Sequence, residues 1–329
     1  MGERIPIELG FSYYQSESLP LSGQRCINWI PTASEGPALN NRALLQPAGL
    51  KQFISATSPV TRGAKVVSGI AYFVNGNDLI EVSSGGIETI RGSIEGSGRV
   101  SLANNAPNVD TGVQYLVIVV PGGKSYAFDA FNKVLTEITH VNFRTSDTVV
   151  FKDGYFVFSA SDGTVFFNSL LNDPLTYDAL DFGTAEIDPD LIVALHVNHN
   201  EMFVAGDQTI ELFQNVAGSG FPFQRIPGAN LTKGVHAKFS LIEFDNTFCF
   251  IGGGVNELSA VWKVAGSSSA IKISTDAIDK EIQKFTKDEI SDSFAMTFSR
   301  HGQFFAVFTF ESETIDSKTF VYNATASAI

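Results

Sequence analysis

The feature that most constrains the fold is a strand–turn–strand unit that recurs six times along the chain. The first strand of each unit begins at one of six positions, spaced between 40 and 56 residues apart: Gly69, Tyr115, Tyr155, Glu201, Thr247 and Gln303. A period of roughly 40 to 50 residues filled with strands is typical of a β-propeller blade. The repeat therefore predicts an all-β, six-bladed β-propeller.

Composition supports a packed protein and argues against several classes of function. The 329 residues are 44% hydrophobic and include 28 Phe, whose flat rings favour strands and can fill the wedge between neighbouring sheets. The net charge of −13 argues against a surface that grips nucleic acid, because such binding needs clustered Lys and Arg. No apolar run approaches the ~20 residues that a membrane span needs, so we expect neither sequence-specific nucleic-acid binding nor membrane insertion.

The chain divides into two parts by composition. Residues 1–60 hold half of the 12 prolines, which suits an extended arm lying on a surface better than it suits a blade. Residues 61–329 contain the six repeats. Each repeat has turn residues between its apolar runs, and Asn75-Gly76 is the strongest hairpin signal among them.

The last repeat departs from the others in two ways. Asp276–Ser291 has the apolar spacing of a single short helix, which Ser274 or Thr275 can cap, and its insertion accounts for the longest step. After this helix the sixth blade has only three strands before the sequence ends at Ile329. We therefore expect an incomplete last blade. Either the arm around Leu44–Ile54 donates the closing strand, or the natural chain continues further.

We find no residue pattern that predicts a catalytic, cofactor or metal site. His196 and His199 have a suggestive spacing, but on a strand they fall on opposite faces, and no third His or Cys lies nearby. The glycine-rich stretches 218–220 and 252–254 lack the following Lys-Ser/Thr of a phosphate-binding loop, so we interpret both as turns or loops. The chain is therefore not expected to be an enzyme.

A propeller that binds or cleaves glycans remains the alternative. It would need carboxylates that converge with aromatic side chains near the axis. The candidate carboxylates are Asp153, Asp162, Asp207 and Glu257, all of which lie at turns.

Two segments are candidates for contacts with partner subunits. Arg91 and Arg99 flank a glycine-rich loop, where the ordinary interpretation is two solvated arginines that cap a turn. The functional interpretation is a contact to a partner subunit, because guanidinium groups are common at interfaces. The second segment is the inserted helix, with four charged candidates: Asp276, Lys280, Lys284 and Lys287. Its alternative role is to cap one face of the propeller.

Several segments, in order along the chain, resemble those of one protein family. The segments are Asn28–Pro31, Pro47–Leu50, Gly96–Ala103, Asp190–Gln214 and Thr275–Phe298. They resemble the packaged-DNA stabilisation proteins, which are the tail hub or tail accessory factors of short-tailed double-stranded DNA bacteriophages. The second segment departs from the family pattern by the inserted Ala48.

The resemblance implies a structural protein of the virion tail, made in the cytoplasm of the bacterial host. Such hub proteins form a ring, expected to be a hexamer, below the portal and its adaptor. They seal the DNA exit channel after packaging and offer attachment to the tail needle and tailspikes. An acidic chain suits a conduit through which DNA passes without sticking.

Overall fold

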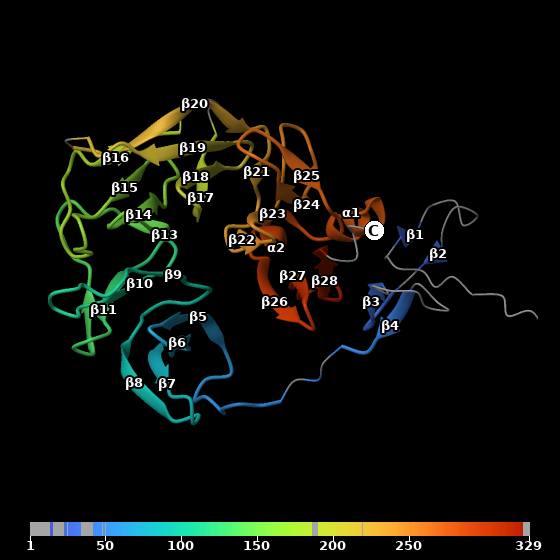
Figure 1. The fold of residues 1–329 in the computed structure, drawn as a ribbon, viewed down its shortest axis with the longest axis horizontal. Coiled ribbons are helices and arrows are strands. Elements are labelled where there is room, and N and C mark those ends of the chain that lie inside the picture. Colours follow the sequence, from blue (N-terminus) through green and yellow to red (C-terminus); the bar gives the residue numbers. More distant parts are fainter. Residues whose placement is uncertain are drawn as a thin grey trace, which may run out of the picture.

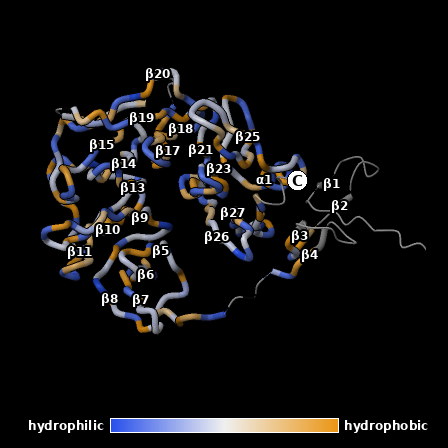
Figure 2. Tube along the Cα trace, in the orientation of Figure 1, coloured by the Kyte–Doolittle hydropathy of each residue, from blue (hydrophilic) through white to orange (hydrophobic). Residues whose placement is uncertain are grey.

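The computed structural model describes residues 14–15, 23–24, 26–33, 42–47, 49, 51–185, 190–218 and 220–324. Within these ranges six antiparallel sheets stand side by side around one axis, each with its first strand toward the centre (Figure 1). Apolar residues occur along the strands of all the sheets, with polar residues among them (Figure 2). The chain is a six-bladed β-propeller, as the repeat predicts.

The first four blades each contain four antiparallel strands in chain order. Blades 1 and 2 are built from β5 (Thr61–Val67), β6 (Ile70–Asn75), β7 (Asp78–Val82) and β8 (Glu88–Ser93), then β9 (Ser101–Asn104), β10 (Tyr115–Val119), β11 (Ser125–Asp129) and β12 (Val134–Glu137). Blades 3 and 4 are built from β13 (Ser146–Lys152), β14 (Tyr155–Ala160), β15 (Phe166–Asn168) and β16 (Phe182–Gly183), then β17 (Ile192–Asn198), β18 (Glu201–Gly206), β19 (Ile210–Asn215) and β20 (Phe223–Leu231).

The last two blades are less regular. Blade 5 has a divided inner strand and blade 6 has three strands: β21 (Gly234–Val235), β22 (Ile242–Phe244), β23 (Thr247–Gly253), β24 (Ala260–Val264) and β25 (Ala270–Lys272), then β26 (Phe294–Arg300), β27 (Gln303–Phe310) and β28 (Lys318–Asn323). Within the described part of the chain no fourth strand pairs with β28.

The predicted starts of the repeats coincide with the second strand of every blade. Strands β10, β14, β18, β23 and β27 begin at the predicted residues, and β6 begins at Ile70, one residue later than predicted. The prediction for Gly252–Gly254 as a turn is wrong, because Gly252 and Gly253 belong to β23. A Cβ on Gly252 would collide with the carbonyl oxygen of Gly234 on the paired strand β21, so this close approach of two backbones needs a glycine.

The inserted segment forms two helices rather than the single predicted one. Helix α1 (Asp276–Ile282) begins after Thr275, whose hydroxyl accepts a hydrogen bond from the Ile278 N–H. Helix α2 (Lys287–Ser291) begins after Thr286, which forms a capping box with Glu289. A second N-cap inside the segment interrupts the helix, because the Thr286 backbone is extended rather than helical.

Apolar clusters fill five of the six junctions between neighbouring blades. Tyr72 and Phe128 meet across blades 1 and 2 with ring centroids 5.3 Å apart, and Phe166 and Phe213 meet across blades 3 and 4 at 4.9 Å. The other clusters join blades 2 to 3, 4 to 5 and 5 to 6. Their many Phe rings fill the wedges, as the composition predicts.

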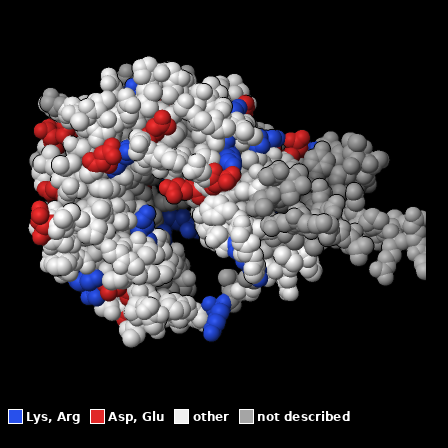
Figure 3. All heavy atoms as spheres, in the orientation of Figure 1, with Lys and Arg blue, Asp and Glu red and all other residues white. Residues whose placement is uncertain are grey.

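The junction between blade 6 and blade 1 is different. None of the apolar clusters formed by described residues joins these two blades. Met296 on β26 and Val321 on β28 are each 54% exposed, and Val66 on β5 is 63% exposed. The space-filling view shows a hollow at the centre of the ring that extends between these two blades (Figure 3).

The arm contributes two short strand pairs outside the propeller. Strand β1 (Tyr14–Gln15) pairs with β2 (Gly23–Gln24), and β3 (Ile30–Ala33) pairs with β4 (Arg42–Leu45). Strand β1 lies against α1, and the β3–β4 hairpin is seen beyond β28 (Figure 1). The arm therefore follows the outer side of blade 6.

Candidate interaction surface between blades 5, 6 and 1

The structure separates the six sequence-predicted contact residues into three places. Arg91 lies on β8, the outer strand of blade 1, and Arg99 lies on the connection from blade 1 to blade 2. Asp276 and Lys280 lie on α1, Lys287 lies on α2, and Lys284 lies on the turn between these two helices, which join blade 5 to blade 6. Arg99 lies at the junction of blades 6 and 1, and the helices pack on blades 5 and 6. Arg91 belongs to a separate cluster.

Arg91 is engaged within its own subunit. Its Nε atom donates to Glu81 Oε2 at 2.9 Å, and Lys133 Nζ reaches the same oxygen at 3.0 Å. Burial on its own would raise the pKa of Glu81, but the hydrogen bonds from Arg91 and Lys133 outweigh it and lower that pKa. Because Lys133 belongs to blade 2, this cluster ties blade 1 to blade 2.

Arg99 links the start of the ring to its last blade. Its guanidinium carbon lies 3.3 Å from the centroid of the Phe294 ring, and its Nη2 atom lies 3.7 Å from Glu311 Oε2. Phe294 opens β26, and Glu311 follows β27. Burial lowers the pKa of Arg99, and the nearby Glu311 and Asp292 oppose that shift. A cation over an aromatic face therefore replaces, at this junction, the apolar packing of the other five.

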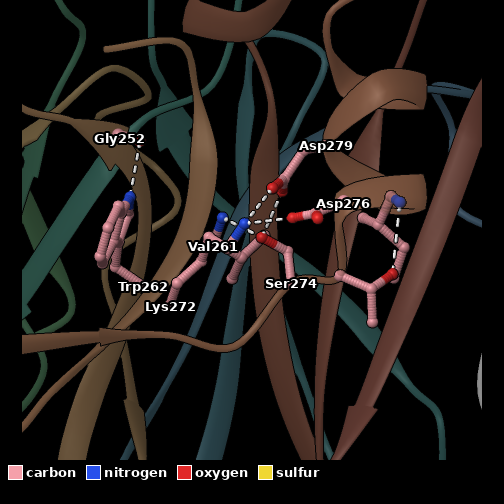
Figure 4. A network of polar contacts seen from close by, with 9 residues as sticks. Gly252, Val261, Trp262, Lys272, Ser274, Asp276 and Asp279 are labelled. Carbon is pink, nitrogen blue, oxygen red and sulfur yellow. Dashed lines mark hydrogen bonds and ion pairs between the residues drawn. The ribbon is translucent and has the colours of Figure 1, made fainter. Parts of the chain in front are cut away.

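Asp276 is used to hold helix α1 on blade 5 (Figure 4). Lys272 Nζ on β25 donates to Asp276 Oδ1 and to Asp279 Oδ2, each at 2.8 Å. The other Asp279 oxygen accepts from Ser274 Oγ at 2.5 Å, and Ser274 accepts in turn from the Val261 N–H at 3.0 Å. The hydrogen bond and charge of Lys272 lower the pKa of Asp276.

The three lysines differ in how far their charge is available to a partner protein. Lys280 has a partner within the chain. Lys284 forms an exposed ion pair with Glu281 at 2.6 Å, and Lys287 is exposed and makes no ion pair with any described residue. Below these lysines Ile282, Phe285 and Ile290 are buried in the apolar cluster of blades 5 and 6. The two helices and the turn between them therefore cover the wedge with apolar side chains and leave Lys284 and Lys287 exposed.

Sequence reasoning missed several residues that shape this region. Lys238, between β21 and β22 of blade 5, forms an ion pair with Asp147 on β13 of blade 3. This pair joins the inner parts of two blades that are not neighbours, so it crosses the middle of the ring. Asp279, 8% exposed, was also missed. Lys238 and Asp147 are 91 positions apart, and no local pattern in the sequence relates them.

The candidate residues for metal or sugar chemistry do not come together. His196 packs on Phe248 with ring centroids 4.6 Å apart, and His199 contacts Asn246 instead. Among the described residues no group of three or more His, Cys, Asp or Glu side chains is placed to hold a metal ion. The carboxylates named for the glycan alternative lie in separate turns of blades 3, 4 and 5, where Glu257 pairs with Lys233 and Asp153 with Lys152.

Neither of the helices found in the described ranges is long and apolar enough to cross a bilayer.

Comparisons with known proteins give a family and a set of distant folds. The family model described as "Bacteriophage P22 Gp10, beta-propeller" matches residues 3–329. The computationally designed Ika8 protein is similar at 16% identity and a TM-score of 0.44, over 80% of this chain and 71% of that one. The N-terminal domain of Nup159 is similar at 10% identity and a TM-score of 0.43, over 78% and 71%. No curated protein matches the chain.

The two structural likenesses are too distant to support an argument. The family match, in contrast, spans nearly the whole sequence and agrees with the six blades observed. The chain therefore belongs to the phage stabilisation family of the bacteriophage P22 Gp10 β-propeller, and it is a structural protein of a phage tail.

Proposed function

We propose that this protein is the tail hub that docks below the portal and its adaptor and seals the DNA exit channel after packaging. In this role it forms a ring, expected to be a hexamer, and offers attachment to the tail needle and tailspikes. The observation that carries the proposal is the family membership over residues 3–329. The resulting virion component would act through surfaces rather than through catalysis.

The geometry of the propeller supports a conduit that lies between subunits. The Lys238–Asp147 ion pair joins blades 5 and 3 across the middle of the ring, so the centre of the propeller itself is not an open passage for DNA. A channel enclosed by several copies would then be acidic, because each chain has a net charge of −13. Repulsion between the carboxylates and the DNA phosphates would keep DNA from binding to its wall.

The two inserted helices are the surface that we assign to the adaptor or to a neighbouring subunit. They interrupt the otherwise regular repeat, and their buried residues Ile282 and Ile290 fix them rigidly on blades 5 and 6. Lys284 is 59% exposed in its side chain, and Lys287 is also exposed. In an acidic chain, two exposed lysines on a rigid support suit an acidic patch on a partner.

The test is binding of the full chain to the purified portal–adaptor complex, followed by sedimentation. The double variant Lys284→Glu, Lys287→Glu should bind about tenfold or more weakly, because two attractive contacts at the edge of an interface become repulsive. Lys124→Glu, which reverses an exposed lysine of blade 2 outside this surface, is the control and should leave binding unchanged.

Two outcomes would count against different parts of the proposal. If the double variant binds as well as the unaltered chain, the helices are not the docking surface. If the unaltered chain fails to bind the portal–adaptor complex, the hub function itself is wrong.

A further inference from the structure

A groove lies between blades 2 and 3, at the end of the blades opposite the two inserted helices. Its walls are the connection from β9 to β10, the turn from β13 to β14, and Leu171 and Asn172 in the connection from β15 to β16. The helices, in contrast, lead into the first strand of a blade and so lie at the other end. The groove has a volume of about 700 Å³, which is typical of a ligand site.

A nearly buried amide group opens onto this groove. Asn105 lines the groove and is 3% exposed. Its Oδ1 atom accepts from the Tyr115 N–H at 2.7 Å, so the other end of the amide is the NH2 donor. This Nδ2 atom makes no hydrogen bond with any residue that the structure describes, and it is not among the polar atoms that are fully enclosed without a partner. It can therefore donate to an oxygen atom of a ligand in the groove.

The walls of the groove carry carboxylates. Asp110 and Asp153 both line it, one from each blade. Asp153 Oδ1 pairs with Lys152 Nζ at 2.9 Å, and Lys152 is 7% exposed. Asp110 is exposed and makes no ion pair within the described ranges. The groove thus contains at least one carboxylate whose charge is not neutralised by the chain itself.

The negative charge extends to an aromatic side chain in the groove. Tyr115, at the start of β10, lines it. Burial raises the pKa of the Tyr115 hydroxyl, and the charges of Asp129 and Asp173 raise that pKa further. These two carboxylates accept hydrogen bonds from backbone N–H groups, and neither forms an ion pair with another described residue. The potential around the Tyr115 ring is therefore negative, which favours a cation there.

These features suit a basic peptide better than other ligands. Phosphates and nucleic acids would be repelled by the carboxylates, and a neutral sugar would leave the charge of Asp110 unneutralised. A lysine or arginine side chain has N–H donors for Asp110 and can lie over the Tyr115 ring. Val109, 99% exposed, and Leu171, 60% exposed, stand on the two walls and would cover an apolar residue next to that side chain.

We propose that this groove binds a basic peptide segment of a partner protein. A lysine or arginine of the segment pairs with Asp110 and lies against Tyr115, and a backbone carbonyl of the segment accepts from Asn105 Nδ2. The groove and the inserted helices lie at opposite ends of the blades, so the inference does not rest on the proposed role as a tail hub.

The test is binding of the labelled full-length protein to an array of random-sequence octapeptides. We expect the bound peptides to contain a lysine or arginine next to an apolar residue, and to release the protein when the NaCl concentration rises from about 50 to about 500 mM. Asp110→Lys should bind these peptides about tenfold or more weakly, because an attractive charge becomes repulsive. Asp316→Lys makes the same change of charge at an exposed position between β27 and β28, and this matched control should bind like the unaltered protein.

A second variant guards against a change of fold. Val109→Lys adds a repulsive charge to the same wall at a side chain that is almost fully exposed, and thermal unfolding should show it to be as stable as the unaltered protein. It should also bind the peptides about tenfold more weakly.

Two results would overturn the proposal. If Asp110→Lys and Asp316→Lys lose binding equally, the peptides are attracted by the acidic chain as a whole and not by the groove. If the protein binds no peptide on the array, or prefers neutral or acidic ones, the groove does not recognise a basic segment.

Discussion

The guanidinium of Arg99 lies over the ring of Phe294, with 3.3 Å between its central carbon and the ring centroid. The two residues are almost two hundred positions apart and belong to opposite ends of the ring. Five junctions of the propeller are closed by apolar clusters, whereas at the sixth the described residues form no such cluster and Arg99 contacts Phe294 and Glu311 instead. A ring that depends on so few contacts at one place should be sensitive to the loss of a single side chain there.

Arg99→Ala should lower the free energy of unfolding by about 1–2 kcal/mol, because a partly desolvated cation–π contact and its packing are lost. Urea unfolding measures this change. Glu311→Gln is the control, and it should cost less than about 0.5 kcal/mol because that ion pair is exposed and long. Equal effects of the two substitutions would show that the ion pair, and not the stacking, holds the junction.

Phe158→Ala should destabilise the protein by about 3–5 kcal/mol, because it leaves a cavity in a fully buried cluster. Phe158 is 0% exposed and packs on Phe143 and Phe167 in the wedge between blades 2 and 3. Phe131→Ala, at a position 62% exposed, should change stability little. Thermal unfolding distinguishes them, and a small effect at Phe158 would contradict the assignment of the Phe-rich wedges as the core.

Lys272→Met should weaken the attachment of α1 by about 1–3 kcal/mol, because the buried Asp279 carboxylate would lose its cation. The control is Lys284→Met, which removes an exposed pair with Glu281 and should cost less than about 0.5 kcal/mol. Chemical denaturation gives both values. If the two variants are equally stable, the network in Figure 4 does not anchor the helix.

His196 should make stability depend on pH between about pH 6.5 and pH 4. Burial lowers the pKa of His196 from 6.5 to about 4, and its buried Nε2 atom has no hydrogen-bond partner among the residues that the structure describes. Between these pH values His196 is protonated in the unfolded chain and neutral in the folded chain. The free energy of unfolding therefore falls as the pH decreases through this window, by up to about 1.4 kcal/mol per pH unit.

His196→Leu removes this titration and keeps an apolar side chain against Phe248. The stability of the variant, measured by denaturation at several pH values, should fall less steeply from pH 6.5 to pH 4 than that of the unaltered protein. Identical slopes would contradict the assignment, since other groups would then account for the whole dependence.

The number of blades and the position of their second strands could be predicted from the sequence, because these strands are continuous apolar runs bounded by Gly, Asn and Asp. Strand β9 at Ser101–Asn104 could not, since its Ser and Asn residues give no apolar run. It is a strand because it pairs with β10, whose residues Leu116 and Val117 are fully buried. Tertiary pairing here overrides a weak local preference.

The contact residues show the same limit. The sequence indicated Arg99 as a contact residue, but not its contact with Phe294, because a contact across a closed ring has no local pattern. Thr286, in contrast, could have revealed the break between the two helices, since Thr-Lys-Asp-Glu is the signature of a capping box. Whether these residues contact other tail proteins stays a prediction.

The measurement that tests the central claim most directly is the mass of the assembly formed with the matching portal–adaptor complex, by light scattering. A tail hub should add to this complex until a fixed number of copies per portal ring is reached, and the Lys284→Glu, Lys287→Glu variant should reach saturation only at higher concentration. A chain that stays monomeric and never joins the portal–adaptor complex would contradict the account.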